Sequence, residues 1–373
     1  MYPRIITTFI IIVCLYAPVF SQVHSHGLAV TSSRLAFVPY NFERRNVGEN
    51  DVLIDILYTG ICHTDVHFAK GDFIEGDVPD GYYPLVPGHE IVGRVREIGK
   101  SVTKFKVGDY AGVGCLVDSC GECEQCRRGE EQYCAKLVPT YAGVDKTGQK
   151  TYGGFSDCVV VTERFAMKIP ATVPLERVAP LLCAGITTYS PLKYNNVRSG
   201  SKVAVAGFGG LGHLAVKYAV AMGAEVTVFD VVESKRQFAA DIGAKRFVNT
   251  RNADELLNTA DSFDLILNTI PVNHDVEMYV KMLRIDGTMV ILGVQKKGQV
   301  PTIHTDQLFG RRKIYGSLIG GTVETQEMLD FSAKHKIFPD VEIINNDAKT
   351  VDKAFENLDN GKAPFRYVIK IKP

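Results

Sequence analysis

Two sets of cysteine and histidine residues in this chain have the types and spacing that metal sites need. The first set falls within fifteen residues in the pattern C-x2-C-x2-C-x7-C and comprises Cys120, Cys123, Cys126 and Cys134. Four thiolates complete the tetrahedral coordination of Zn²⁺ and leave no vacant position, as in structural zinc sites. We name these residues the closed cluster and predict that zinc stabilises a lobe with almost no apolar core of its own. A redox-active cysteine pair is the alternative interpretation.

The second set is scattered along the chain and has a different composition. Cys62, His89 and Cys183 would offer one zinc ion two sulfurs and one nitrogen, leaving a fourth position for water or a substrate oxygen. Zinc held in this way acts as a Lewis acid. Glu90 directly follows His89 and is a candidate transient ligand. We name these four residues the open cluster; the alternative is that Cys183, which has no partner near it in the sequence, is a buried thiol.

A glycine-rich turn indicates dinucleotide binding. The apolar strand KVAVA runs directly into the turn Gly207-Phe208-Gly209-Gly210-Leu211-Gly212, which opens a helix. Gly207 allows the tight turn, Gly209 lets the backbone approach a pyrophosphate, and Gly212 allows close packing of helix on strand. The helix N-terminus offers free N–H groups and a positive dipole to the phosphates. A glycine turn without a ligand is the alternative, which this strand–turn–helix context disfavours.

Asp230 ends the next predicted strand, eighteen residues after Gly212, and bears on the choice of cofactor. Its carboxylate can accept hydrogen bonds from the adenosine ribose. It would also repel a 2′-phosphate by about 4 kcal/mol at about 4 Å and an effective dielectric near 20. We therefore predict that NAD is preferred and NADP is possible, because Lys235 and Arg236 could bind a phosphate. A solvated strand end is the alternative role for Asp230.

The segment after Cys62 carries groups that can move a proton. Thr64 and His67 follow Cys62 by two and five residues. We expect a substrate proton to pass through the Thr64 hydroxyl and the cofactor ribose to His67, which reaches water. Asp65 is a candidate acceptor for the other ring nitrogen of His89. Four further histidines lack such spacing and are interpreted as structural: His213, His274, His304 and His335.

The elements that must position these residues form two predicted domains. From residue 27 to 171, short alternating runs separated by Gly, Pro and Asp predict a β-rich domain, with strands at 51–60, 91–98 and 158–161. From 172 to 317, strands and helices alternate, which predicts a doubly wound parallel sheet. Its predicted strands are 202–206, 225–229, 263–268 and 288–292, and its predicted helices are 211–222 and 233–242. Residues 318–373 are expected to return to the first domain through a helix at 324–335 and a strand at 367–371.

Composition limits the class of partner. The chain has 373 residues, 46% of them hydrophobic, which suits a globular protein of about two domains. Lys+Arg and Asp+Glu are both 42, so the formal net charge is zero. Without a basic surplus we expect a small-molecule partner rather than nucleic acid.

Residues 1–21 predict a secretory signal peptide, because Arg4 precedes an apolar stretch that Thr7, Thr8 and Pro18 make too interrupted for a stable membrane span. An uncleaved anchor or an unused extension on a cytoplasmic protein is the alternative. Secretion would favour disulfides among the nine cysteines. The metal-site spacing nevertheless favours zinc. Cys115 and Cys158 match no motif and are predicted to be buried thiols.

Several motifs together resemble one enzyme family. The segment Gly88-His89-Glu90-x2-Gly93-x5-Gly99-x2-Val102 resembles the signature of zinc-containing alcohol dehydrogenases in the medium-chain dehydrogenase/reductase superfamily. Three stretches, CLVDSCGECEQC, LCAGIT and GFGGLGH, are similar to the cinnamyl alcohol dehydrogenase branch, and the resemblance covers nearly everything after about residue 27. It implies a GroES-like catalytic domain, a Rossmann domain and a homodimer. It also implies that the open cluster serves a catalytic zinc and the closed cluster a structural zinc.

The resemblance further implies cofactor contacts and a reaction. The contacts map onto Thr64, Thr187, Thr269, Gly293 and the run Ser317-Leu318-Ile319. Many members of the branch carry a small hydroxyl residue in place of Asp230, in keeping with NADP use. The expected reaction is reversible oxidation of a primary alcohol, whether aromatic, allylic or medium-chain, to an aldehyde. A polyol dehydrogenase and a non-catalytic zinc- and nucleotide-binding protein are the alternatives.

Overall fold

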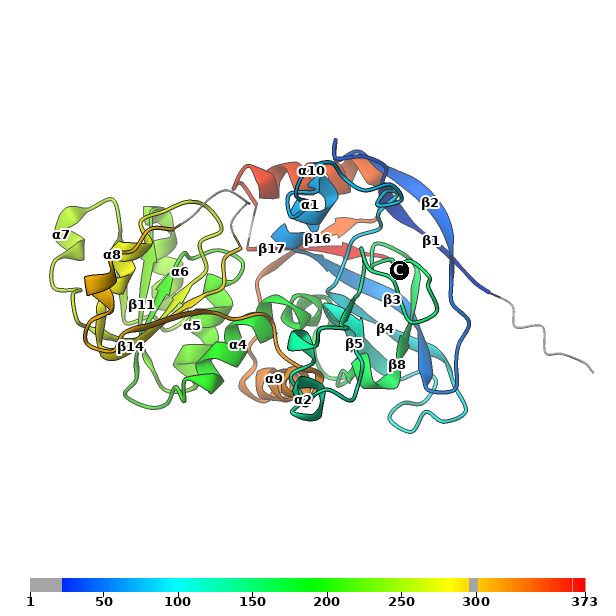
Figure 1. The fold of residues 1–373 in the computed structure, drawn as a ribbon, viewed down its shortest axis with the longest axis horizontal. Coiled ribbons are helices and arrows are strands. Elements are labelled where there is room, and N and C mark those ends of the chain that lie inside the picture. Colours follow the sequence, from blue (N-terminus) through cyan, green and yellow to red (C-terminus); the bar gives the residue numbers. More distant parts are fainter. Residues whose placement is uncertain (1–21, 295–300, 364, 373) are drawn as a thin grey trace, which may run out of the picture.

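A computed structural model of the chain describes residues 22–294, 301–363 and 365–372. It consists of two units side by side, one β-rich and one with a parallel sheet (Figure 1). The predicted fold class is therefore confirmed. The predicted signal peptide, residues 1–21, lies outside the described residues. Among the described residues, no helix combines the length and apolarity that crossing a bilayer requires.

The β-rich unit is built on a seven-stranded sheet with the order β16-β17-β3-β4-β5-β9, and β8 pairs with β3 off this path. Two small hairpins, β1–β2 and β6–β7, complete it. The strands are β1 (Val23–Val30), β2 (Phe37–Arg44), β3 (Asp51–Ile61), β4 (Ile91–Ile98), β5 (Tyr110–Val113), β6 (Leu116–Asp118), β7 (Val138–Pro139), β8 (Cys158–Thr162), β9 (Ala166–Lys168), β16 (Val341–Asn345) and β17 (Arg366–Lys370).

The C-terminal segment lies in this same sheet. β17 pairs antiparallel with β3, and Tyr367 is the register partner of Ile61. Arg366, one residue earlier, therefore lies beside the end of β3, where Cys62 follows. This pairing joins residues about three hundred positions apart in the sequence.

The second unit is a six-stranded parallel sheet with the order β12-β11-β10-β13-β14-β15. Renumbered within the unit this is the 3-2-1-4-5-6 order of the Rossmann fold, which binds dinucleotides where the strand order reverses. The sequence predicts that β14 starts at residue 288, whereas the strand begins at Leu283. The prediction is late because the exposed residues 284–286 interrupt the apolar pattern of the strand. The strands are β10 (Lys202–Ala206), β11 (Glu225–Asp230), β12 (Arg246–Asn249), β13 (Phe263–Asn268), β14 (Leu283–Ile291) and β15 (Lys313–Gly316).

Helices cover both sheets, and α1 and α10 lie over the β-rich sheet while α9 lies near α2 (Figure 1). One apolar cluster runs from Val92 of β4 through Leu182 and Ile186 to Val203 of β10, so the two units share a buried core. The helices are α1 (His63–Lys70), α2 (Glu124–Arg127), α3 (Leu175–Val178), α4 (Ala184–Tyr194), α5 (Gly212–Ala221), α6 (Arg236–Asp241), α7 (Ala253–Leu256), α8 (Val276–Val280), α9 (Thr322–His335) and α10 (Ala348–Asp359). Short 3-10 helices are η1 (Glu131–Tyr133), η2 (Glu163–Phe165), η3 (Ala179–Leu182), η4 (Glu233–Lys235) and η5 (Thr305–Leu308).

Candidate functional site

The open cluster is assembled from three separate places in the fold. Cys62 joins β3 to α1, His89 and Glu90 lie directly before β4, and Cys183 joins η3 to α4. One ligand atom from each residue lies within 4.8 Å of all the others, and all four residues are buried. The Sγ atoms of Cys62 and Cys183 are 4.0 Å apart. Two sulfurs on tetrahedral zinc lie about 3.8 Å apart, given zinc–sulfur bonds of about 2.3 Å, so this spacing fits zinc.

The ring of His89 is oriented by a buried carboxylate. His89 Nδ1 lies 3.0 Å from Asp65 Oδ1, and because a carboxylate can only accept, Nδ1 donates. Asp65 also accepts the main-chain N–H groups of Cys62 at 2.8 Å and Gly88 at 3.1 Å. His89 Nε2 is buried without a hydrogen-bond partner. Burial lowers the pKa of His89, but Asp65, Cys115 and Cys62 outweigh this and raise it well above its usual value. A bound metal would take the place of the proton on Nε2 and offset the cost of burying this nitrogen.

Glu90 has one oxygen engaged and one without a partner. Its Oε1 pairs with the guanidinium of Arg366, which is also buried, and its Oε2 is buried without a hydrogen bond. Burial raises the pKa of Glu90 to about 7, although Arg366 acts against the shift. No local sequence pattern points to Arg366, because only the pairing of β17 with β3 brings it here.

The thiols of the open cluster differ in acidity. The pKa of Cys62 is lowered well below its usual range, mainly by hydrogen bonding with Cys183. The pKa of Cys183 is raised, first by Cys115 and then by Cys62. A bound cation would favour the thiolate form of both ligands. The prediction that Cys115 is simply a buried thiol is wrong, because Cys115 is half-buried and lines a cavity together with Leu182.

The predicted proton path lies on α1. Thr64 and His67 are three residues apart, which places them on one face of the helix. His67 Nδ1 lies 2.7 Å from Asp72 Oδ2, and His67 Nε2 is buried without a partner. The expectation that His67 reaches water is wrong, because the residue is only 4% exposed. Asp72, whose side chain is 20% exposed, lies against it instead.

Asp72 was missed by the sequence analysis, and its place depends on how α1 ends. Gly71 takes a left-handed conformation with φ of 77°, and the Asp72 N–H then donates to the His67 carbonyl at 2.9 Å. This turn folds Asp72 back onto the imidazole. A glycine directly before an acidic residue, at the end of a helix carrying histidine, is the signal that could have found it.

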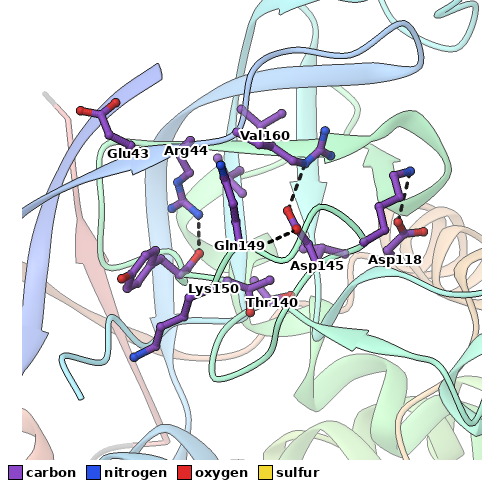
Figure 2. Close-up of a pocket in the computed structure, with 14 residues that line it drawn as sticks. Glu43, Arg44, Asp118, Thr140, Asp145, Gln149, Lys150 and Val160 are labelled. Carbon is purple, nitrogen blue, oxygen red and sulfur yellow. Dashed lines mark hydrogen bonds and ion pairs between the residues drawn. The ribbon is translucent and has the colours of Figure 1, made fainter. Parts of the chain in front are cut away.

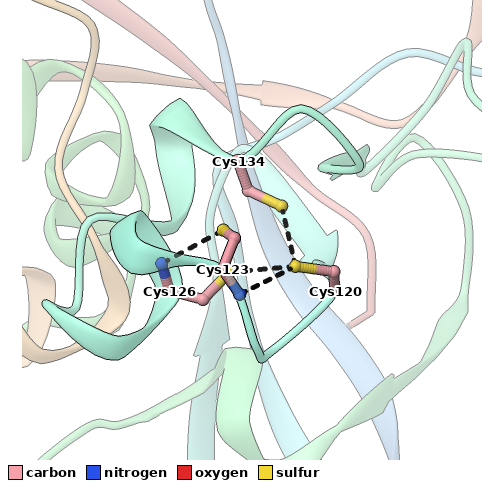
Figure 3. A group of neighbouring side chains, drawn as sticks. All are labelled: Cys120, Cys123, Cys126 and Cys134. Carbon is pink, nitrogen blue, oxygen red and sulfur yellow. Dashed lines mark hydrogen bonds between the residues drawn. The ribbon is translucent and has the colours of Figure 1, made fainter.

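The closed cluster is compact and local (Figure 3). Its four sulfur atoms lie within 4.8 Å of one another, with Cys120 Sγ at 3.8 Å from Cys126 Sγ and 3.5 Å from Cys134 Sγ. Main-chain N–H groups donate to the sulfurs of Cys120, Cys123 and Cys134 at 3.4, 3.5 and 3.3 Å. These bonds stabilise thiolates, and hydrogen bonding to main-chain N–H groups lowers the pKa of Cys120 to about 6. The spacing again fits four sulfurs on one zinc ion.

The glycine turn has the geometry that a pyrophosphate site needs. Gly207 has φ of 87°, which favours glycine. A β-carbon at Gly212 would lie 2.0 Å from the Gly207 carbonyl oxygen, whereas one at Gly209 would meet nothing within 4 Å. Leu211 precedes the first residue of α5. A β-carbon at Gly210 would lie 2.8 Å from the Phe365 carbonyl oxygen, so the C-terminal segment packs on the turn.

Asp230 is tied to this turn rather than solvated. It is 9% exposed, and its Oδ2 accepts the Phe208 N–H at 2.7 Å and Lys235 Nζ at 3.2 Å. Its Oδ1 accepts the Val232 N–H at 2.9 Å. The alternative interpretation as a solvated strand end is therefore wrong, and the Asp230 carboxylate lies next to the turn.

The other predicted cofactor residues follow the carboxyl ends of β13, β14 and β15, or lie on α4. The Thr269 hydroxyl donates to the Gly207 carbonyl at 2.9 Å, and the Gly293 N–H donates to the Asn268 carbonyl at 3.1 Å. The Thr187 N–H donates to the Cys183 carbonyl at 2.9 Å, which links α4 to the open cluster. Ser317 follows β15, and Ile319 lines the same cavity as Cys115.

A separate cavity lies between the β1–β2 hairpin and the β6–β8 region (Figure 2). Its charged walls are internally paired: Lys146 pairs with Asp118 at 3.4 Å, and the Arg44 guanidinium donates to the Ser156 hydroxyl at 2.8 Å. No residue of either cluster lines it. We therefore do not place the chemistry there.

Comparison with known proteins finds two matching family models. The alcohol dehydrogenase GroES-like domain matches residues 48–171, and the zinc-binding dehydrogenase domain matches residues 210–334. A probable formaldehyde dehydrogenase of Bacillus subtilis is 48% identical over 352 residues, covering 94% of this chain and 99% of that protein. A mannitol dehydrogenase of Petroselinum crispum is 46% identical, covering 89% of this chain and 97% of that protein.

Among solved structures, the one described as CAD from Helicobacter pylori complexed with NADP(H) superposes with a TM-score of 0.87. It is 47% identical and covers 94% of this chain and 99% of its own.

Proposed function

This chain belongs to the zinc-containing alcohol dehydrogenases of the medium-chain dehydrogenase/reductase superfamily, in the cinnamyl alcohol dehydrogenase-like branch, and we propose its substrate and mechanism from that premise. It is an alcohol dehydrogenase or aldehyde reductase that uses NAD(P). The proposed substrates are primary alcohols of aromatic, allylic or medium-chain type. The partnerless Nε2 of His89, buried among two thiols and a carboxylate, is the observation that carries the proposal.

Zinc bound by Cys62, His89 and Cys183 would act as a Lewis acid toward the substrate oxygen. The chain itself supplies orientation and proton transfer. Asp65 holds the His89 ring so that Nε2 points into the cluster. The Thr64 hydroxyl and His67 Nε2 lie on one face of α1 and accept and pass on the proton lost by the alcohol. Asp72 keeps His67 Nδ1 engaged, so that Nε2 is the nitrogen that receives the proton.

The test is an assay of zinc-replete protein with benzyl, allyl and medium-chain primary alcohols, following reduction of NAD and NADP separately. We expect turnover of at least one of these classes. Absence of turnover with all of them would contradict the proposal and favour the non-catalytic alternative.

A polyol dehydrogenase is the second candidate, and the similarity to a mannitol dehydrogenase supports it. Mannitol and sorbitol assayed beside the primary alcohols discriminate the two candidates. A higher kcat/KM for mannitol than for every simple primary alcohol would reverse our order of preference.

For the cofactor we propose NAD over NADP. The buried Asp230 beside the glycine turn supports this, because its charge disfavours a 2′-phosphate. Lys235, 3.2 Å from Asp230, and the NADP(H) complex of a 47% identical structure point the other way. We expect Asp230→Ser to shift the ratio of kcat/KM toward NADP by about tenfold or more, or about 1.4 kcal/mol. A wild-type preference for NADP would overturn the proposal.

We further propose two zinc ions per chain, a homodimer, and entry into the secretory pathway. Metal analysis of purified protein tests the two zinc ions, since one zinc per chain would contradict them.

Light scattering tests the homodimer, since the mass of a single chain would contradict it. N-terminal sequencing of the mature protein tests entry into the secretory pathway, because cleavage would leave a chain that begins near residue 22 and an unprocessed chain would contradict it.

A further inference from the structure

Glu131 is a buried carboxylate that belongs to neither cluster and has no role in the reaction proposed above. It begins η1, three residues before Cys134, and is 1% exposed. The Thr322 N–H donates to its Oε2 at 3.0 Å, and the Thr322 hydroxyl donates to its Oε1 at 3.1 Å. Glu131 lies in the segment that carries the closed cluster, residues 120–134, which we name the closed-cluster lobe. This lobe is thus hydrogen-bonded to the first residue of α9.

α9 depends on this contact because it has no cap of its own. Its N-cap residue is Gly321, which has no side chain to accept the free N–H groups of the first turn. The Glu131 carboxylate accepts the Thr322 N–H in its place, and its negative charge suits a helix N-terminus. The lobe therefore supplies α9 with a cap from outside the helix.

Arg164 fastens the same carboxylate to the closed cluster. Its Nη2 donates to Glu131 Oε1 at 2.8 Å and to the Cys126 carbonyl at 3.2 Å. Burial raises the pKa of Glu131, but hydrogen bonds from Thr322 and Arg164 outweigh this and hold the pKa below its usual range. Glu131 is therefore ionised at neutral pH, and its bonds are charge-assisted.

The two backbones approach as closely as the chain allows. A β-carbon at Gly321 would lie 1.7 Å from the Gly129 carbonyl oxygen and 2.6 Å from Glu131 Oε2. Figure 1 shows α2, which precedes Gly129, next to α9. Only glycine fits at position 321, so a shift of the lobe would be transmitted directly to the segment before α9.

That segment is conformationally unusual. Ile319 has φ of 38°, a left-handed conformation that β-branched residues rarely adopt. It is buried and lines the same cavity as Cys115 and Leu182, the residue before Cys183. Such a backbone persists only where its surroundings hold it.

Ile319 follows β15, and the place of β15 in the sheet order indicates which half of the cofactor Ile319 would face. Asp230 ends β11, on one side of the central strand β10, whereas the Ser317–Ile319 run follows β15, on the other side. A dinucleotide crosses such a sheet at the point where the strand order reverses. With the adenosine near Asp230 and the pyrophosphate at the glycine turn, a bound dinucleotide would direct its nicotinamide toward Ile319 and the open cluster.

We propose that Glu131 is a positioning residue that caps α9 from the closed-cluster lobe and thereby holds Ile319-Gly320-Gly321 against the nicotinamide half of the cofactor. The closed cluster thus contributes to cofactor binding as well as to the stability of its own lobe. The inference rests on the proposed function only in taking the Ser317–Ile319 run as part of the cofactor site.

The experiment compares E131Q with E130Q in the full-length, zinc-replete protein. Glu130 is the matched control, because it precedes Glu131 and its carboxylate pairs with Arg128 rather than with Thr322. Two dissociation constants are measured by calorimetry: that of the reduced dinucleotide which the wild type binds more tightly, and that of ADP-ribose, which lacks the nicotinamide ring. We expect E131Q to weaken dinucleotide binding by about tenfold, as for one lost charge-assisted bond, and to leave ADP-ribose binding unchanged. E130Q should change neither.

Equal weakening of both ligands in E131Q would mean general destabilisation and would overturn the proposal, as would no change in either ligand. T322V keeps the main-chain bond and removes only the hydroxyl bond, so it tests the proposal even if E131Q does not fold. We expect T322V to weaken binding of the reduced dinucleotide less than E131Q does and to leave ADP-ribose binding unchanged. If E131Q does not fold, unchanged binding of both ligands by T322V would overturn the proposal. Selective loss in a protein that turns over no alcohol would contradict the proposed function alone, whereas a wild type that binds neither ligand would overturn both.

Discussion

The closed and open clusters use similar ligands but are built in different ways. The closed cluster comes from fifteen consecutive residues, and main-chain N–H groups of its own turn donate to its sulfurs. The open cluster comes from three places in the chain, and side chains of other segments, Asp65 and Arg366, hold its members. A local cluster mainly stabilises its own loop. An assembled cluster depends on the whole fold, which keeps its groups in position for chemistry.

The two clusters also differ in what they leave unsatisfied. In the open cluster, His89 Nε2 and Glu90 Oε2 are buried without a hydrogen-bond partner. In the closed cluster three of the four sulfurs accept a main-chain hydrogen bond. Because burying an unpaired polar atom is costly, its presence marks the cluster where a ligand must complete the site. Substitutions in the two clusters should therefore have different effects.

Cys183→Ser, in the open cluster, should have the largest effect and should lower turnover far more than stability. We expect kcat/KM for a primary alcohol to fall by at least about a thousandfold, or about 4 kcal/mol, because one metal ligand is lost. The melting temperature should change little. Cys158→Ser, a buried thiol in neither cluster, is the control and should retain activity. Near-normal turnover by Cys183→Ser would contradict the assignment of the open cluster.

Cys123→Ser, in the closed cluster, should lower stability far more than turnover. We expect the free energy of unfolding to fall by about 4 kcal/mol or more, because loss of a structural metal is among the few single changes of that size. The kcat of the protein that remains folded should fall far less than in Cys183→Ser. Denaturant titration with zinc analysis checks both values. If Cys123→Ser lost zinc without losing stability, the closed cluster would have no structural role.

The proposed proton path, which runs from the open cluster along α1, can be tested at His67 and Asp72. We expect His67→Ala to lower kcat by about a hundredfold, as for loss of a general base, and added imidazole to restore part of it. Asp72→Asn should lower kcat less and change its pH profile, because Asp72 acts through His67. Asp77→Asn, exposed in the same loop, is the control. An unchanged pH profile in Asp72→Asn would remove Asp72 from the relay.

His213 sharpens the comparison because its Nε2 is also buried without a partner, yet no other metal-ligand residue gathers around it in the described part of the chain. Burial lowers its pKa to about 3. The ordinary pKa is about 6.5, so between these values the unfolded chain binds a proton that the folded chain does not. Stability should therefore fall by about 1.4 kcal/mol per pH unit as the pH drops through this window.

Denaturant titrations from neutral pH to about pH 4 should show this loss in the wild type and not in His213→Asn. Parallel pH dependence of the two proteins would mean that His213 is not a buried neutral imidazole. A partnerless nitrogen would then mark a metal site only where other ligand atoms surround it, as at His89.

Patterns that are local in the sequence predicted most of the fold. β10, β11 and β13 are short apolar runs in the sequence. The glycine turn between β10 and α5 is recognisable because its geometry requires glycine at positions 207 and 212. The predicted start of β14 is five residues late, because residues 284–286, directly after its first residue, are exposed. The burial of His67 and the half-exposure of Cys115 were not predictable, because neither depends on its neighbours in the sequence.

The closed cluster, the glycine turn and the identity of the residues in the open cluster could be read from the amino-acid sequence, because short-range spacing sets how a turn or a helix face presents its side chains. How the distant residues of the open cluster meet depends on the tertiary structure. The register of β17 against β3 sets Arg366 beside Glu90, and the fold of the closed-cluster lobe sets Glu131 at the start of α9. The physical reason is that contacts between segments far apart in the chain depend on how whole sheets and helices pack, which no local pattern records.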